Sequence, residues 1–296
     1  MASVITIGNF DGQHLGHARL FGMVKDAARR RGLQSTALSF HPHPSWVLGT
    51  PKQLITSYDE RRANVAASGV DRFVEVNFDK DFAGMNPEEF MRFLAADMGC
   101  KELVIGDDYR FGKGATGRFE DYQDLAIALD MVVNVANAVE IEGTRVSSSA
   151  IRKFIRDTDF KMAARFLGRP FAVTGTVSRG MQRGRRLGFP TANVTPPPEK
   201  LLPPDGVYYT KIWIKDQLLR GITNVGTNPT FTGQNGPGRT VESHVFNFND
   251  DIVGEMIRVD IVKFIRPERK FASGEELVRQ IEKDVESCGD DSDDTQ

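Results

Sequence analysis

The sequence predicts a parallel α/β domain followed by an all-β domain that ends in a helix. Over residues 1–168, short β-branched runs alternate with helical apolar patterns, which is typical of a parallel sheet with crossover helices. From residue 169 onward the pattern changes to short alternating strands with turn residues between them. A closing helical pattern begins at Gly274. We therefore expect domains at 1–168 and 169–288, and a disordered acidic tail at 289–296.

Composition excludes several classes of function. The chain has 296 residues, of which 40% are hydrophobic and 26% charged, so a packed core is expected. A formal net charge of -2 argues against general binding of nucleic acid, which needs a basic face. No stretch has the length and apolar character of a membrane span, and no signal peptide is recognised. Cys100 and Cys288 lack metal-type spacing and suit a reducing compartment, so we expect a cytoplasmic protein.

The first predicted strand, residues 4–7, runs into an unusual polar turn. The strand is an apolar, β-branched run, and a helical pattern follows the turn. Ligands of doubly wound sheets bind at the carboxyl ends of the strands, so this turn is a candidate binding element. His14 and His17 stand at the helix start, where both could neutralise nucleotide phosphates. Two surface histidines are one alternative, and a metal pair, which would need further ligands, is another.

Strands and helices then alternate along the first domain. We predict strands at residues 36–40, 73–78, 102–105 and 132–135, and helices at residues 58–68, from Pro87 onward, and at residues 159–167. A polar, glycine-rich loop at residues 106–114 follows the third of these strands, at the expected ligand edge. It lacks the spacing of a P-loop. We interpret the histidines of the loop 41–44 as incidental to a stiff proline-rich connection.

A second phosphate site is predicted where a helix begins near residue 148. Ser147 and Ser148 precede an apolar helical pattern, and Arg152 follows one turn later. Serines in such positions are ordinary helix caps, which is the alternative interpretation. A capped helix N-terminus also binds phosphate, and an arginine one turn in can reach the same anion. We favour phosphate binding, because the occurrence of both this element and the histidine turn would otherwise be a coincidence.

A segment rich in glycine and arginine, residues 178–188, predicts phosphate binding in the second domain. Gly180, Gly184 and Gly188 recur every four residues, and glycines let backbone amides approach an anion closely. Arg183 is one of four arginines that add charge suited to phosphate. On these glycines alone, a basic surface loop is the favoured alternative.

The residues that follow suit a magnesium ion that already carries nucleotide phosphates. Pro190 restricts φ, and Thr191 and Asn193 stand two residues apart on an extended segment. Their side chains therefore point to the same side. Two neutral oxygen atoms beside a phosphate cradle are suitable magnesium ligands. A plain edge strand is the alternative.

The remaining strands of the second domain are predicted from alternation. They span residues 171–177, 206–214, 217–224, 241–248 and 257–264. Glu242 is notable because it stands on an otherwise apolar alternating strand. Taken alone, a strand-edge carboxylate that faces solvent is the favoured interpretation.

These motifs together resemble the bacterial bifunctional riboflavin kinase/FMN adenylyltransferase family. The similarity lies in segments that occur in the family's order, namely residues 8–17, 106–114, 147–152, 178–194, 224–231, 241–246 and 266–271. The resemblance implies a Rossmann-like nucleotidyltransferase domain, then a small antiparallel β-barrel riboflavin kinase domain with a C-terminal helix. It also implies the reactions. ATP with magnesium phosphorylates riboflavin to FMN, and a second ATP adenylylates FMN to FAD with release of pyrophosphate.

The resemblance implies site residues as well. Those implied to be catalytic are Glu242, as the base of the kinase, and His14, His17 and Arg152 in adenylyl transfer. Those implied to bind ATP in adenylyl transfer are Gly8, Asn9, Phe10, Asp11, His14, His17, Ser148 and Arg152, and those implied to bind FMN are Asp108 and Phe111. Those implied to bind ATP in the kinase are Gly180, Arg183, Gly184, Thr191 and Asn193. Thr191 and Asn193 are also implied to bind the metal, and Arg266 and Phe271 to bind the flavin. Ser149 and Asn228 depart from the family's usual Thr and Arg.

Two other functions stay open at this point. One is a monofunctional FAD synthetase with an inactive kinase module, and the intact Thr191, Asn193 and Glu242 argue against it. The other is a non-catalytic sensor of flavin or nucleotide, which the presence of both phosphate-handling motifs disfavours. The expected partners are the small molecules riboflavin, FMN and ATP, with no nucleic acid and no membrane. A homo-oligomer is left open.

Overall fold

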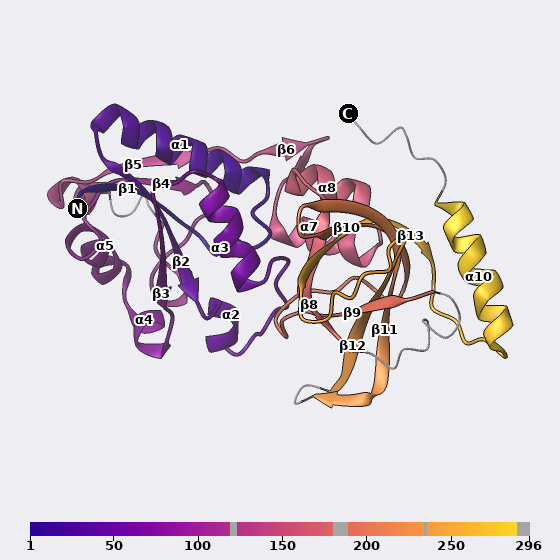
Figure 1. Ribbon diagram of the computed structural model, residues 1–296. Coiled ribbons are helices and arrows are strands. Elements are labelled where there is room, and N and C mark those ends of the chain that lie inside the picture. The colour runs from indigo at the N-terminus through magenta and orange to yellow at the C-terminus, as the bar shows by residue number, and fades with distance from the viewer. Residues whose placement is uncertain (119–122, 180–188, 234–235, 289–296) are drawn as a thin grey trace. The chain divides into compact units, whose positions relative to one another are not determined.

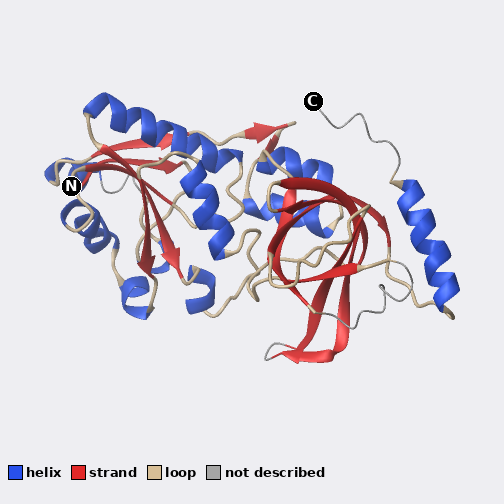
Figure 2. Ribbon diagram, in the orientation of Figure 1, coloured by secondary structure: helices blue, strands red, loops and turns tan. Residues whose placement is uncertain are grey.

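The computed structural model describes residues 1–118, 123–179, 189–233 and 236–288, without the side chains of residues 228–237 (Figure 1). The chain divides into two units, residues 1–150 and residues 151 onward. Helices and parallel strands build the first unit, and antiparallel strands build most of the second (Figure 2). The predicted fold class is confirmed, while the predicted domain boundary at residues 168/169 stays a prediction.

The first unit is built on a five-stranded parallel sheet with strand order β3-β2-β1-β4-β5. The strands are β1 Ser3–Ile7, β2 Gln34–His41, β3 Arg72–Asn77, β4 Cys100–Gly106 and β5 Val132–Ala136. The central strand β1 pairs with β2 on one side and with β4 on the other. The strand order therefore reverses between β1 and β4, and sheets of this kind bind ligands at the carboxyl ends of the strands at that reversal.

Local sequence signals decide where the helices of this unit begin and end. The elements are α1 Leu15–Arg31, α2 Pro44–Val47, α3 Tyr58–Ala67, α4 Lys80–Gly84, α5 Pro87–Ala96, a 3-10 turn η1 Lys113–Ala115, α6 Gln123–Ala128 and the small hairpin β6 Glu140–Ile141 and β7 Thr144–Arg145. Capping boxes begin α3, with Ser57 and Glu60, and α5, with Asn86 and Glu89. Gly32 caps the C-terminus of α1, and its φ of 64° is left-handed and therefore favours glycine.

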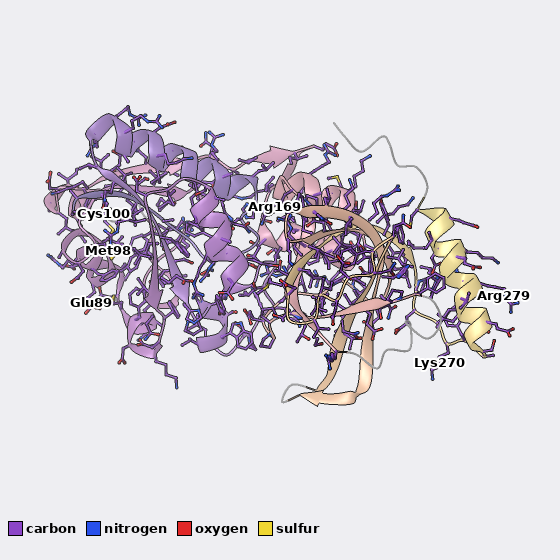
Figure 3. All side chains as sticks on the ribbon, in the orientation of Figure 1. Glu89, Met98, Cys100, Arg169, Lys270 and Arg279 are labelled. Atoms are coloured by element: carbon purple, nitrogen blue, oxygen red, sulfur yellow. The ribbon has the colours of Figure 1, made fainter. Side chains whose placement is uncertain are left out.

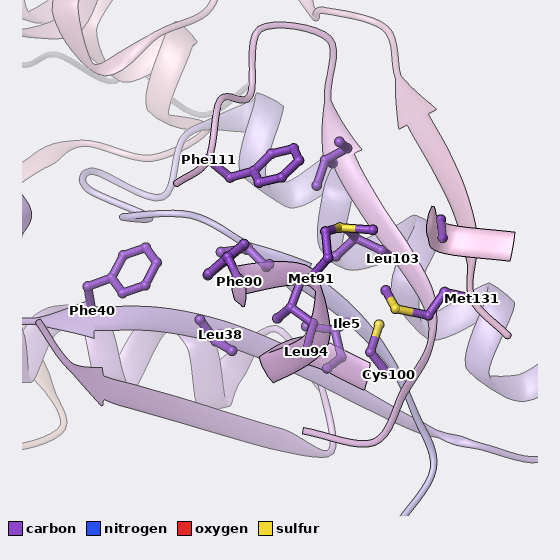
Figure 4. Close-up of a cluster of buried hydrophobic side chains, with 13 residues drawn as sticks. Ile5, Leu38, Phe40, Phe90, Met91, Leu94, Cys100, Leu103, Phe111 and Met131 are labelled. Atoms are coloured by element: carbon purple, nitrogen blue, oxygen red, sulfur yellow. The ribbon is translucent and has the colours of Figure 1, made fainter. Parts of the chain in front are cut away.

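The side chains of β1 alternate between two hydrophobic layers. Val4 packs with Val24 of α1 on one face of the sheet. Ile5 points to the opposite face, into a cluster that contains Phe90 and Leu94 of α5 (Figure 4). Successive side chains of a strand point to opposite faces, so a fully apolar strand is expected where helices cover both faces.

The two cysteines are buried and not linked to each other. Cys100 begins β4 (Figure 3) and lies in the same hydrophobic layer as Leu94 (Figure 4). Burial raises the pKa of the Cys100 thiol to about 12, so this thiol is neutral at pH 7 and packs as a small apolar group.

The second unit contains a closed antiparallel barrel with strand order β10-β11-β12-β9-β8-β13. The strands are β8 Phe171–Ser178, β9 Thr191–Thr195, β10 Gly206–Ile214, β11 Gln217–Gly233, β12 Gly236–Val245 and β13 Met256–Arg266. The helices are α7 Ser148–Arg156, which begins in the first unit, α8 Phe160–Leu167 and α10 Gly274–Ser287. Closure pairs each of these strands on both sides, which removes exposed strand edges.

Alternation along the barrel strands separates a filled interior from a helix-covered outer face. In the interior, the hydroxyls of Thr210, Thr223 and Ser243 form a chain with two oxygen–oxygen distances of 2.9 Å, so these buried groups bond to one another. On the outside, Val285 of α10 packs in a cluster with Tyr209 of β10.

Two strands of the barrel differ from their predicted bounds by more than two residues. The sequence predicts a strand that ends at residue 224, but β11 continues to Gly233. The predicted strand 241–248 is instead β12, which starts at Gly236 and ends at Val245. The cause is tertiary, because the two strands extend each other by pairing, with Thr232 opposite Pro237 and Gly233 opposite Gly236. Glycines and prolines interrupt the alternation of apolar and polar residues in this stretch, so alternation alone does not predict the pairing.

We expect Leu94→Ala to destabilise the first unit by about 2–5 kcal/mol, because a buried leucine loses its burial and leaves a cavity. The measurement is urea unfolding followed by the fluorescence of Trp46, in a Trp213→Phe background that leaves Trp46 as the remaining tryptophan of the two in the chain. Arg92→Ala, on an exposed position of the same helix, is the matched control. Equal effects of the two substitutions would contradict the assignment of Leu94 to the core.

Candidate active sites

The turn after β1 is held by hydrogen bonds from the segment that precedes α3. Asp11 Oδ1 accepts from the backbone N–H of Thr56 at 3.2 Å, and the N–H of Gly12 donates to Thr56 Oγ1 at 3.0 Å. Phe10 and Gln13 have φ values of 47° and 40°, in the left-handed region that non-glycine residues rarely adopt. Such a backbone persists where surrounding contacts over-determine it, which is common at functional sites.

His14 and His17 lie together at the N-terminus of α1. Their rings stack with centroids 3.7 Å apart, and the ring of Phe10 meets that of His17 edge-on at 5.3 Å. A Cβ at Gly8 would lie 2.9 Å from the Phe10 ring, so the glycine allows this packing. Asn9 is exposed in the same turn. These predicted ATP-binding residues therefore occupy one place, at the carboxyl end of β1 and beside a helix N-terminus that favours anions.

Helix α7 begins beside the same turn. Ser148 Oγ donates to the carbonyl oxygen of Asp11 at 2.8 Å, although the two residues are far apart in sequence. Ser147 Oγ accepts from the N–H of Ala150 and so caps the helix. Arg152 follows one turn later on α7. The structure thus brings Ser148 to the histidine turn, and the role of Arg152 stays a prediction.

The loop after β4 is tied to β7 by ion pairs. The guanidinium of Arg145 donates to both carboxylate oxygens of Asp107, and it lies 3.0 Å from Asp108 Oδ1. The hydrogen bonds from Arg145 hold the pKa of Asp107 below its ordinary value. The side chain of Asp108 is 73% exposed, so it can be reached by a ligand. Its contact with FMN stays a prediction.

The side chain of Phe111 is buried, although the residue belongs to the loop that follows β4. It is buried in the hydrophobic layer of Phe90, with the two ring centroids 5.8 Å apart (Figure 4). Its backbone pairs with that of Gly117 through two hydrogen bonds of 3.2 and 2.9 Å. Phe111 therefore packs in the core and shapes the loop, and its predicted contact with FMN stays a prediction.

The register of the barrel brings predicted kinase residues together. Asn193 of β9 stands opposite Glu242 of β12, which in turn stands opposite Asn224 of β11. Opposite residues of paired strands share a face, so these three polar side chains form a row. All three are half-buried, whereas their neighbours Ala192 and Val241 point inward and are buried. Glu242 thus lies beside the predicted magnesium ligand Asn193.

Thr191 extends this face by one step. It stands opposite His244, whose Nδ1 lies 2.9 Å from the carbonyl oxygen of Pro190 and donates to it. Thr191 and Asn193 both line a cavity of about 590 Å³. The cavity is also lined by Ser178, Ser243, Asp250 and Asp251. Its lining therefore offers hydroxyl, amide and carboxylate oxygens, the atom types that magnesium prefers.

Among the described residues, no group of three or more His, Cys, Asp or Glu side chains could hold a metal ion. Sequence reasoning missed Asp250 and Asp251, because a loop of Asn and Asp residues carries no periodic signal.

The segment after β13 is anchored at two points. Arg266 makes a bidentate ion pair with Asp284 of α10, with distances of 3.0 and 2.8 Å, and its guanidinium lies 5.7 Å from the Phe271 ring centroid. Glu268 accepts a hydrogen bond from Asn224 Nδ2 at 3.0 Å, which ties the segment to the polar row. Arg266 and Phe271 thus lie together, and their contact with a flavin stays a prediction.

Three predicted ATP-binding residues, Gly180, Arg183 and Gly184, lie outside the described residues.

Comparisons with known proteins match both units. A family profile described as FAD synthetase matches residues 1–150, and one described as riboflavin kinase matches residues 167–290. The chain is 35% identical to a bifunctional riboflavin kinase/FMN adenylyltransferase of Bacillus subtilis (strain 168), over 97% of this chain and 91% of that protein. It is also 35% identical to the protein of that name from Escherichia coli (strain K12), over 95% of this chain and 90% of that protein.

A solved structure shares the fold. It is described as a macrolide-efflux protein from Streptococcus pneumoniae and superposes with a TM-score of 0.85 at 33% identity, covering 97% of this chain and 93% of that chain. In the part of the chain that the structure describes, none of the helices combines the length and the apolar character that crossing a membrane requires.

We expect Arg145→Gln to raise the pKa of Asp107 toward the ordinary aspartate value, because the amide supplies no positive charge. The measurement is a pH titration of the carboxyl carbons by NMR. Asp71 is the internal control, because hydrogen bonds from Ser35 lower its pKa and the substitution does not touch them.

The lowered pKa of Asp107 also makes the stability of the fold depend on pH. A carboxyl group whose pKa is lowered on folding stabilises the fold above its unfolded pKa, and this contribution is lost as the pH falls through the folded pKa. The stability of the variant should therefore decline less in that acidic range. An unchanged titration of Asp107 would contradict the assigned ion pair.

Proposed function

Because this chain belongs to the bifunctional riboflavin kinase/FMN adenylyltransferase family, we propose that its first unit makes FAD and its second unit makes FMN. The chain carries an FAD synthetase domain and a riboflavin kinase domain, and its biochemical role is FMN and FAD biosynthesis. Riboflavin, FMN and ATP are the substrates that this membership implies. The observation that supports the residue assignments best is the pairing of Asn193 with Glu242, together with the stacked His14 and His17.

In adenylyl transfer, a phosphate oxygen of FMN attacks the α-phosphorus of ATP. The bond from that phosphorus to the β-bridging oxygen breaks, and pyrophosphate leaves. FMN supplies the nucleophile, so the protein needs to position the reactants and to neutralise charge. We assign the second task to His14 and His17, aided by the N-terminus of α1. Arg152 is proposed to add positive charge from α7, and Ser148 and the turn residues Gly8, Asn9, Phe10 and Asp11 to bind ATP.

In the kinase reaction, Glu242 is proposed to accept the proton of the ribityl hydroxyl as the γ-phosphoryl group of ATP is transferred. Its half-buried position opposite Asn193, a residue that lines the cavity, is compatible with this role. Thr191 and Asn193 are proposed to hold magnesium through their side-chain oxygens, which fits the hard oxygen lining of the cavity. When bound, magnesium would neutralise phosphate charge.

The remaining assignments are also proposals. Asp108 and Phe111 are proposed to line the FMN site, and Arg266 and Phe271 the riboflavin site. The domain boundary near residue 168 and the cytoplasmic location stay predictions from the sequence. The oligomeric state stays open.

Chromatography of flavins after incubation with riboflavin, ATP and magnesium distinguishes the candidate functions. FMN followed by FAD supports both activities, FAD only from added FMN favours the monofunctional synthetase, and no product from either flavin favours the sensor.

We expect His17→Ala to reduce FAD formation by about 100-fold or more, because one donor aimed at developing charge is typically worth that much. FMN formation from riboflavin by the same variant should be unchanged. The measurement is the rate of each product by flavin chromatography. A parallel loss of both activities in a folded variant would show that the two units do not act independently.

We expect Glu242→Gln to lose about 100-fold or more of FMN formation, because the amide keeps the size of the side chain but cannot accept the proton. Conversion of supplied FMN to FAD should stay normal in this variant, which serves as the counterpart of His17→Ala. Normal kinase turnover would remove Glu242 from the role of base.

A further inference from the structure

Arg61 is a buried arginine outside all the sequence motifs. It lies in the first turn of α3, and its side chain is 3% exposed. Its guanidinium donates to the carbonyl oxygen of Asn9 at 3.1 Å and to that of Phe40 at 3.0 Å, and it also pairs with the carboxylate of Glu75 on β3. Its own carbonyl oxygen accepts from Gln13 Nε2 at 3.3 Å. One residue thus bonds to both ends of the nucleotide turn, residues 8–13.

Neutralising Glu75 does not by itself account for Arg61. Glu75 also accepts from Arg62 Nε at 2.6 Å, and the side chain of Arg62 is 47% exposed, so its charge costs little to place. A buried charge is costly unless it is paired and hydrogen-bonded. Arg61 meets that requirement through Nη1 and Nη2, which bond to two main-chain carbonyls and to Glu75, while its buried Nε has no hydrogen-bond partner among the described residues. The rigid planar fork of arginine can serve several acceptors at once.

The nucleotide turn needs such a restraint. Phe10 and Gln13 both hold a positive φ, which is strained for a residue with a side chain and persists only where surrounding contacts over-determine it. The guanidinium of Arg61 donates to the carbonyl of Asn9, just before Phe10, whereas the bond to the side chain of Gln13 is accepted by the main-chain carbonyl of Arg61. Loss of the guanidinium would release the turn at Asn9 and leave the bond at Gln13 in place, so the turn would relax from its first end and shift His14, which follows it directly.

We propose that Arg61 is a positioning residue for FAD synthesis, which holds the turn 8–13 so that His14 and His17 face the nucleotide phosphates. The proposal rests on the proposed function of the first unit. Arg61 acts through the turn and not on the substrate, since its bonds go to protein carbonyls and to Glu75. Displacing a reacting group by about 1 Å can lower a rate by about 100-fold.

The test uses the full chain with Arg61→Met, which keeps an unbranched side chain but no donors. We expect kcat of FAD formation to fall by about 10- to 100-fold, with KM for FMN changed by less than about threefold, because the turn is displaced while the flavin site stays intact. The riboflavin kinase rate of the same variant should be unchanged. Arg62→Met is the matched control. It also loses a bond to Glu75 but makes none to the turn, and it should keep near wild-type FAD synthesis.

Two further variants separate positioning from charge balance and from folding. If Arg61 only neutralised Glu75, the double variant Arg61→Met/Glu75→Gln would regain FAD synthesis, and positioning predicts that it does not. Arg61→Lys keeps the charge without the fork and should recover only part of kcat. Fluorescence of Trp46, in the Trp213→Phe background, reports whether the first unit of each variant is folded. If Arg61→Met does not fold, the kcat and KM of Arg61→Lys decide the question. A wild-type kcat in a folded Arg61 variant, or rescue by the double variant, overturns the proposal.

His17→Ala is measured alongside to separate this inference from its premise. If His17→Ala keeps wild-type FAD synthesis, the proposed function of the turn fails, and the inference about Arg61 fails with it. If His17→Ala loses the activity while folded Arg61→Met keeps it, only the inference about Arg61 fails. Loss in both variants, with Arg62→Met active, supports the positioning role.

Discussion

The pairing of β1 with β2 on one side and β4 on the other is the constraint on which the first unit depends. This pairing buries β1 completely. The strand ends at Ile7, and the chain leaves the sheet at Gly8 in the turn that carries the histidines. The pairing also makes β1 and β4 neighbours at the point where strand order reverses. Polar loops that follow these two strands therefore meet one edge of the sheet, which is where such folds bind nucleotides.

The turn itself is shaped by contacts that come from several places in the chain. Thr56 bonds to Asp11 and Gly12, and Ser148 bonds to the carbonyl of Asp11. The bonds to the N–H of Gly12 and to the carbonyl of Asp11 satisfy backbone groups that lie outside the sheet and the helix. A rigid turn is useful here, because adenylyl transfer needs no protein nucleophile and depends on where the charged groups stand.

In the barrel, strand register brings the polar residues of the candidate site together, whereas in the first unit they gather at a helix N-terminus. Residues far apart in sequence, such as Asn193 and Glu242, become direct neighbours because β9 pairs with β12. The hydroxyl chain through Thr223 keeps polar groups satisfied in the interior, while α10 covers part of the outer face. The ion pair of Arg266 with Asp284 ties α10 to the end of β13, and so fixes the helix on that face.

The sequence by itself determined the fold class, the central strands and the family, because these depend on local periodicity and on contiguous motifs such as residues 8–17 and 190–193. Tertiary structure decided which polar residues meet. Nothing in the local sequence distinguishes the buried Arg61 from the exposed Arg62, since both stand in one charged run, and only the packing of α3 against the sheet separates them. In the same way, alternation shows that Glu242 is unusual on its strand, but only the register of β12 places it beside Asn193. Burial and strand pairing are long-range properties, so they follow from the folded chain and not from any one segment of it.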